Sequence, residues 1–333
     1  MRATLALIFF SGALSIPAAA DPIPETGGFS GFINLGVGAG QIESNMLAGV
    51  KSIELSNNRI DSLSGPSSEN VTLPVGGFEV SYTFDQTKTQ LFVGNLLEDY
   101  LRFDLTSRVG IRQAIDGIGT FSFEALSTPI ATDTWEDPYA TGIKRSTTER
   151  TSSGVRVGWE QIMGTGLEVR VAARELDVDD ELSGESLGLN ADDRALLDRT
   201  GDFTKVDVLW TVKLDDHSRL IPSLSYSDRD LDGDAMSRNG YVASLSYQLS
   251  SGRWSYVTNV AYGKYESDAT NPIFGKTDER DVKAASFTAF YHKPFGWDGW
   301  AVNAGLAWSE EDSNISFYDA TAMLASVGLL RRF

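Results

Sequence analysis

Apolar and polar residues alternate with a period of two along most of the chain. Leu167, Val169 and Val171, for example, alternate with Glu168 and Arg170. A period of two places the apolar side chains on one face of a β-strand and the polar side chains on the other. The pattern therefore predicts an all-β protein whose strands each have one apolar face and one largely polar face.

Fourteen segments show this alternation. They lie near residues 28–42, 76–85, 88–95, 100–113, 117–128, 148–162, 166–178, 202–214, 217–229, 238–250, 253–266, 280–293, 299–310 and 317–333. An even number of strands with apolar outer faces and polar inner faces is typical of bacterial outer-membrane barrels. Strand boundaries read from a sequence are uncertain by a few residues, so 12 or 16 strands also fit the pattern.

The connections between these segments alternate in length. Those after even-numbered strands are tight, such as 85–87 and 215–216, whereas those after odd-numbered strands include 43–75, 129–147 and 179–201. Outer-membrane barrels have short periplasmic turns and long extracellular loops. We therefore predict a transmembrane, antiparallel, up-and-down β-barrel of about 14 strands.

The first twenty residues have the features of a signal peptide. Arg2 supplies a positive charge, residues 4–16 are mostly apolar, and Ala18 to Ala20 provide small residues for cleavage. We expect residues 1–20 to be removed and residues 21–333 to form the barrel. Such a signal exports the protein, and together with the predicted barrel it leads us to expect the protein in the outer membrane of a Gram-negative bacterium.

The composition excludes some functions. The 333 residues include no cysteine, which rules out disulfides and thiolate metal sites. The formal net charge is -18, and a nucleic-acid binder needs a positive surface. Most of the negative charge lies in the predicted outer loops, where divalent cations bridge anionic lipids. The expected partners are therefore the lipid bilayer and lipopolysaccharide, with the oligomeric state left open.

Four stretches carry a family resemblance: GFSGFINLGVGAG from Gly28, ESNMLAG from Glu43, WEDPYATGIKR from Trp135 and DLDGDAMS from Asp230. They resemble a porin-like family of Gram-negative outer-membrane β-barrel proteins known as a domain of unknown function. The resemblance implies the barrel and its compartment, and it implies no activity or site.

The C-terminus resembles a second known signal. Phe333 is the last residue and Gly328 lies five positions before it, as in the signal that the barrel-assembly machinery recognises. Arg331 stands where that signal normally has an aromatic or apolar residue. We therefore expect the assembly machinery to be a partner.

Charged residues line the predicted inner face of strands four to eight. They are Arg102, Asp104, Arg108, Arg112, Glu124, Arg156, Glu160, Glu168, Arg170, Arg174, Lys205, Asp207 and Lys213. Charges on the wall of a wide lumen select ions. The set predicts a channel for passive diffusion of small hydrophilic solutes, with a mild preference for anions or zwitterions. Alternatively, the charges pair across strands and brace a plugged, non-conducting barrel whose loops act as a receptor or adhesin.

The segment 43–75 is long and more apolar than a solvated loop. Three interpretations remain open: a hatch folded into the lumen, a surface loop packed on its neighbours, or an extension of the adjoining strands. Pore size depends on which of them is correct.

A possible calcium loop lies near residue 230. Its carboxylates are Asp228, Asp230, Asp232 and Asp234, with Gly233 among them. Alternating carboxylates followed by glycine resemble the start of a calcium-binding loop, but the twelfth position is Asn239 rather than glutamate. An acidic turn is the alternative, and we expect no other cofactor.

Enzyme activity is the least favoured class of function. Outer-membrane enzymes generally need a histidine or an acid cluster near the outer rim. The two histidines of the chain, His217 and His292, fall at predicted periplasmic turns. We therefore expect no enzyme activity.

Overall fold

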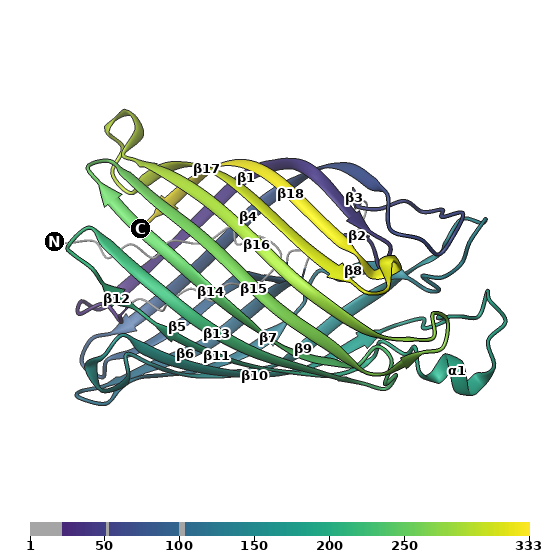
Figure 1. Ribbon diagram of the computed structural model, residues 1–333. Helices are drawn as coiled ribbons and strands as arrows, with labels where there is room; N and C mark the ends of the chain where they lie inside the picture. Colours follow the sequence, from purple (N-terminus) through teal and green to yellow (C-terminus); the bar gives the residue numbers. More distant parts are fainter. Residues whose placement is uncertain (1–21, 51–52, 100–103) are drawn as a thin grey trace.

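The computed structural model describes residues 22–50, 53–99 and 104–333. Within these ranges fourteen long strands pair antiparallel with their neighbours, and the first pairs with the last, so that the sheet closes into a barrel (Figure 1). The strands are β1 (Gly28–Ser44), β4 (Ser68–Phe84), β5 (Thr89–Asp99), β6 (Asp104–Ile115), β7 (Gly119–Ser127), β9 (Thr147–Glu160), β10 (Leu167–Val178), β11 (Gly201–Trp210), β13 (Ser218–Leu231), β14 (Arg238–Ser251), β15 (Trp254–Asn271), β16 (Lys276–His292), β17 (Trp300–Ser313) and β18 (Ala320–Arg332). The predicted class and strand number are confirmed.

The strands have an apolar outer face and an inner face that is polar along most of the barrel. On β7, Phe121 and Phe123 are 40% and 51% exposed, whereas the alternate residues Ser122 and Glu124 are buried. This is the reverse of a soluble protein, in which large apolar side chains are buried and charges are exposed. A barrel in lipid needs this reversed arrangement, because hydrocarbon surrounds it and its lumen is polar.

The two ends of the barrel differ as the sequence predicts. At one end, here called the turn end, the strands are joined by tight turns such as 85–88 and 252–253. The opposite, loop end carries longer connections, among them 136–146 and 179–200, and the latter contains the short helix α1 (Ala191–Ala195) (Figure 1). The C-terminal Phe333 lies at the turn end, where its backbone exchanges hydrogen bonds with that of Gly31.

Short elements complete the described chain. Strands β2 (Leu47–Val50), β3 (Ile53–Glu54) and β8 (Thr132–Trp135) lie at the loop end, and β12 (Val212–Lys213) at the turn end. Single 3-10 turns occur at Ile162–Gly164, Pro294–Gly296 and Ser316–Tyr318. None of the helices in the described ranges is long and apolar enough to cross a membrane. The predicted signal peptide, 1–20, lies outside the described residues.

The start of the second barrel strand was predicted wrongly. Strand β4 begins at Ser68 rather than at residue 76, and it pairs with β1 from Ser68 onward. Its inner face there carries Val71, Leu73 and Val75, which continue the alternation. Pro74 interrupts the pattern, but in the described residues β5 joins β4 only from Glu79, so Pro74 lies on a free strand edge, where proline is tolerated. The long connection is therefore 45–67.

Candidate functional site: the lumen and its loop cover

Charged side chains from neighbouring strands pair on one inner wall of the barrel. Glu79 of β4 forms ion pairs with both Arg108 and Arg112 of β6. Glu124 of β7 lies 3.4 Å from Arg108 and 3.6 Å from Arg156 of β9, measured between oxygen and nitrogen. We call this group the ion-pair wall. It also includes Glu168, Arg170 and Arg174 of β10 and Lys205 and Asp207 of β11. Opposite charges that face each other across strands stabilise the sheet.

Some of these side chains reach across the lumen. Arg174 of β10 donates a hydrogen bond of 2.9 Å to Thr106 of β6, although two other strands separate β6 from β10 in the sheet. Lys205 and Asp207 of β11 pair at 3.3 Å. Paired side chains therefore occupy part of the lumen at this level.

Most of the predicted pore-lining residues lie on this wall. Ten of the thirteen are on the inner face and are buried or half-buried: Arg108, Arg112, Glu124, Arg156, Glu160, Glu168, Arg170, Arg174, Lys205 and Asp207. Lys213 does not belong to the lumen, because it is exposed at the turn end and pairs with Asp216 at 2.8 Å. Arg102 lies outside the described residues, and Asp104 is the first residue of β6.

Glu79, the acid that joins Arg108 to Arg112, was not among the predicted lumen residues. A signal was present, because Glu79 shares its odd-numbered face with the buried Ser81 and Thr83. The predicted charged wall began only at the fourth strand, so the second strand was left out. The ion-pair wall is consequently closer to neutral than the thirteen residues suggested.

The opposite wall carries small neutral groups that bond to one another. Asn259 of β15 accepts a hydrogen bond from Ser246 at 2.5 Å and donates one to Ser286 at 2.9 Å. Asn303 of β17 donates to Asn34 of β1 at 2.8 Å. Polar side chains thus line the barrel interior on both sides.

A cavity of about 120 Å³ lies in the lumen near the loop end, and we call it the outer chamber. Among the described side chains, those that line it include five arginines and a single acidic residue: Arg150, Arg199, Arg229, Arg238, Arg280 and Glu311. The rest of the lining is largely apolar and includes Leu176, Val178 and Leu231. The chamber therefore combines positive charge with apolar surface.

An apolar cluster closes the loop end above the chamber. Its buried members are Tyr139, Leu197, Ala235, Ile315, Phe317 and Tyr318, and Met46, Ile60, Leu63, Leu189, Leu196, Met236, Ile273 and Phe274 pack against them. These residues come from six of the outer connections. We call the cluster the loop cover. Met46, Ala235, Met236 and Tyr318 belong to both the cover and the chamber lining, so the chamber lies directly beneath the cover.

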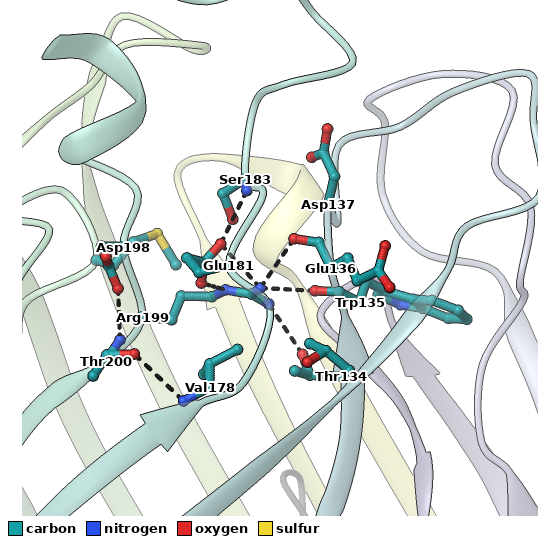
Figure 2. A network of polar contacts seen from close by, with 12 residues as sticks. Thr134, Trp135, Glu136, Asp137, Val178, Glu181, Ser183, Asp198, Arg199 and Thr200 are labelled. Carbon is teal, nitrogen blue, oxygen red and sulfur yellow. Dashed lines mark hydrogen bonds and ion pairs between the residues drawn. The ribbon is translucent and has the colours of Figure 1, made fainter. Parts of the chain in front are cut away.

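Arg199 ties connection 179–200 to the end of β8 and to Glu136, which follows β8 (Figure 2). Its guanidinium donates to the carboxylate of Glu181 at 2.5 Å, to the carbonyl of Trp135 at 2.7 Å and to the hydroxyl of Thr134 at 3.1 Å. The side chain is buried, so each of these bonds is made away from bulk water. Losing one partner of such a buried charge is costly.

A second buried arginine, Arg145, holds the long connection 45–67. It donates to the carbonyl of Asn45 at 2.9 Å and also to that of Asn57, and its guanidinium lies 4.0 Å from the ring centre of Trp135. Burial lowers the pKa of Arg145 to about 10, and the Asp137 carboxylate opposes this effect. The guanidinium is still charged at neutral pH and bridges the two connections.

The connection 45–67 folds into the barrel as a hatch. Leu47 and Leu55 pack against Ile42, Val71 and Leu324, which lie on the inner faces of β1, β4 and β18. Strand β2 of this connection also pairs with β8. The three interpretations of 43–75 thus apply to different parts of it. Its ends extend β1 and β4, Leu47 and Leu55 form a hatch, and Ile60 and Leu63 pack on neighbouring loops in the loop cover.

The acidic motif lies at the rim of the barrel. Asp228 and Asp230 are on β13, and Asp232 and Asp234 are in the turn that follows. Within the described part of the chain no three histidine or carboxylate side chains are grouped as a metal site would require. Calcium binding by the motif stays a prediction.

Gly328 and Phe333, the two residues of the predicted assembly signal, lie in different surroundings. Gly328 faces Asn303, and a Cβ atom at this position would lie 2.9 Å from the Asn303 side-chain oxygen. Phe333 is 49% exposed at the turn end. Close packing inside the barrel therefore explains Gly328 without reference to assembly, and recognition by the assembly machinery stays a prediction.

These features define a closed β-barrel with an apolar outer surface and a polar lumen. The chain belongs to the family described as "Protein of unknown function (DUF2860)", whose model matches residues 28–331. The resemblance to a family of unknown function is confirmed. A comparison with curated proteins finds no match.

Several solved barrels resemble this one. A Pseudomonas aeruginosa FadL homologue is 10% identical, with 91% of this chain and 90% of that chain covered and a TM-score of 0.47. The P. putida toluene transporter TodX is 9% identical, with coverages of 92% and 90% and a TM-score of 0.47. The outer membrane channel DcaP of Acinetobacter baumannii is 10% identical, with coverages of 97% and 100% and a TM-score of 0.41. Identities this low bear on the fold alone.

Proposed function

We propose that the protein is an outer-membrane channel for small hydrophilic solutes that conducts when its loop cover moves aside. The observation that supports this most is the polar lumen with a cavity inside it, closed at its loop end by connections rather than by the barrel strands. Loops rearrange more readily than a closed sheet, because fewer backbone bonds hold them. The apolar outer face of the strands supports a place in a bilayer.

The charges of the outer chamber support a preference for anionic or zwitterionic solutes. Its lining includes five arginines and a single glutamate. A low-dielectric wall focuses the field of such charges into the lumen. The closely paired ion-pair wall adds little to this preference, since its positive and negative charges are nearly balanced.

A non-conducting structural barrel is the second candidate. The observation that favours it is the burial of the ion-pair wall: Glu124, Arg156 and Arg174 are 4%, 7% and 3% exposed. Side chains packed in this way narrow the lumen at that level. If the wall blocks the lumen, the barrel does not conduct even when the cover is open.

Planar bilayer recordings test the proposal. We expect the purified protein to be mostly closed, with brief openings, and Arg199→Met to increase the open fraction several-fold because it frees connection 179–200. Lys213→Met is the matched control, since Lys213 is an exposed cation outside the lumen. Reversal potentials of the open state should favour anions.

Two results would contradict the proposal. If the wild-type protein and Arg199→Met both insert and never conduct, the barrel is structural. Strong cation selectivity of the open state would remove the anion preference.

A further inference from the structure

We propose that Glu160 is the proton-binding group of a pH-sensitive switch: its side chain is a neutral carboxylic acid while the lumen is closed and releases its proton when the lumen opens. The link to opening rests on the function proposed above, whereas the protonation of Glu160 does not. Three features carry the proposal: the burial of this carboxyl group, the lack of a cationic partner and a second acid beside it.

Glu160 is buried at the turn end of the barrel. It is the last residue of β9, its side chain lies on the inner face, and it is 3% exposed. Its oxygen Oε2 is shielded from water and receives no hydrogen bond from the described residues. A carboxylate in such surroundings is costly, because neither water nor a donor compensates its charge. A buried acid without a partner therefore takes up a proton.

The acids of the ion-pair wall differ from Glu160, because each of them has a cationic partner. Glu79 pairs with Arg108 and Arg112, Glu124 with Arg108 and Arg156, Glu168 with Arg170, and Asp207 with Lys205. Among the described side chains, none forms an ion pair with Glu160. The charged groups that act on it are Arg112, Glu124, Glu168 and Arg170. Both arginines of this set already pair with other acids.

A second acid, Glu168, lies beside Glu160. Trp159 of β9 and Val169 of β10 are cross-strand partners, so the antiparallel register places Glu160 and Glu168 next to each other. Both side chains are on the inner face and 3% exposed. Like charges that face each other in a sheet are destabilising, and neighbouring carboxyl groups resist ionising together. A proton on Glu160 removes this repulsion while Glu168 keeps its ion pair with Arg170.

Opening of the lumen changes the protonation of Glu160. Water reaches the carboxyl group in the open lumen, and a glutamate in water ionises near about pH 4.3. Above this pH the open barrel releases the proton, whereas the closed barrel retains it, so a rise in pH favours the open barrel. Release of one proton raises the ratio of open to closed barrels by at most about tenfold per pH unit. Acid pH therefore closes the lumen.

Infrared spectroscopy of the detergent-solubilised full chain tests the protonation without requiring conduction. A protonated carboxyl group has a C=O stretching band that is separate from the bands of carboxylates and backbone amides. We expect this band in the wild-type protein at neutral pH and its loss in Glu160→Gln. Glu175→Gln is the matched control, because Glu175 is an exposed glutamate on β10, the strand that carries Glu168, and should leave the band unchanged.

Planar bilayer recordings test the link to opening. We expect the ratio of open to closed wild-type barrels to rise by about tenfold or more between pH 5 and pH 7. Glu160→Gln, which stays neutral at every pH, should remain mostly closed and lose this rise. Glu175→Gln should keep it.

The outcomes separate this proposal from the proposed function. Absence of the infrared band from the wild-type protein at neutral pH overturns the proton site, and this result needs no variant to fold. A band of equal size in Glu160→Gln overturns it as well. If the band belongs to Glu160 but the wild-type protein and Glu160→Gln open with the same pH dependence, the link to opening fails. A protein with the Glu160 band that never conducts keeps the proton site and loses both the channel and the link.

Discussion

Tyr139 and Tyr318 form the polar centre of an otherwise apolar loop cover. Their hydroxyl groups are 2.6 Å apart, and the amide of Asn271 donates to the Tyr318 oxygen at 2.7 Å. Burial raises the pKa of Tyr139 to about 12, and the bond to Tyr318 and the nearby Arg199 charge oppose part of this rise. The closed cover therefore keeps Tyr139 neutral at pH values where a phenol in water is ionised.

This pKa makes the cover sensitive to alkaline pH. In the open or unfolded cover, Tyr139 ionises near the ordinary pKa of 10.0, whereas in the closed cover it ionises at about 12. Below pH 10 Tyr139 is neutral in both states, so the closed cover keeps its full stability. This stability falls as the pH rises from 10 to about 12, because Tyr139 then ionises in the open cover but not in the closed one. Absorbance titration of phenolate in the folded protein should show a late step that Tyr139→Phe reduces.

The matched control for this titration is Tyr241→Phe. Tyr241 lies on the outer surface of the barrel, outside the loop cover, so this variant controls for the removal of one tyrosine elsewhere in the chain. Heat-unfolded protein should lack the late step altogether. Identical titrations of the wild-type protein and Tyr139→Phe would contradict the burial of this hydroxyl.

At the residue scale, the sequence predicted positions on strands better than positions in loops. The inward direction of Arg108 or Glu168 follows from the parity of a single strand, which is local information. The roles of Arg145 and Arg199 do not, because their partners lie far along the chain: Asn45 is one hundred residues from Arg145. No spacing rule connects residues that only the closed barrel brings together.

At the scale of elements, the connection 45–67 shows where periodicity stops being informative. Strand β4 continues the alternation back to Ser68, and the pairing of Glu43 with Ser68 places the ends of the connection side by side. The apolar residues of the hatch, such as Leu47 and Leu55, have no regular spacing, because they pack against a wall already formed by other strands. Their apolar character predicted burial, but the surface that buries them could not be read from the sequence.

Two deletions distinguish the hatch from the strands beside it. Replacing residues 46–66 by a short turn should leave a folded barrel, because Glu43 and Ser68 are already paired, and its conductance should exceed that of the full chain. Deleting 43–75 also removes residues 68–75 of β4 and their hydrogen bonds to β1. We therefore expect this shortened barrel not to close. Electrophoretic mobility of unheated samples reports folding, and bilayer recordings report conductance.

Two results would contradict the prediction for these deletions. If both deletions fold equally well, then residues 68–75 contribute nothing to closure, and the register of β1 with β4 is wrong. If the shorter deletion folds but conducts no better than the full chain, the ion-pair wall rather than the hatch limits the flow.

At the scale of the whole molecule, polarity is inverted relative to a soluble protein, and this inversion also explains how much of the fold was predictable. Lipid on one side and a polar lumen on the other impose a strict alternation on each strand, so fourteen segments could be counted. The loop cover has no such rule. It is a small apolar core assembled from six separate connections, and its local sign was apolar residues between the predicted strands, such as Ile60 and Ile273.

Charge placed on the outer surface tests the inversion directly. Leu306 is 61% exposed near the middle of β17, and Asp312 lies on the same face of that strand near the loop end. An arginine at the bilayer midplane costs about 2–4 kcal/mol, and one near the interface costs about 0–1 kcal/mol. Leu306→Arg should therefore lower the free energy of unfolding in lipid vesicles by several kcal/mol, whereas Asp312→Arg should change it little. Urea titrations of both variants in vesicles measure the difference. Because water solvates arginine wherever it is exposed, equal stabilities would mean that Leu306 faces water rather than lipid, and the assignment of this barrel to a membrane would fail.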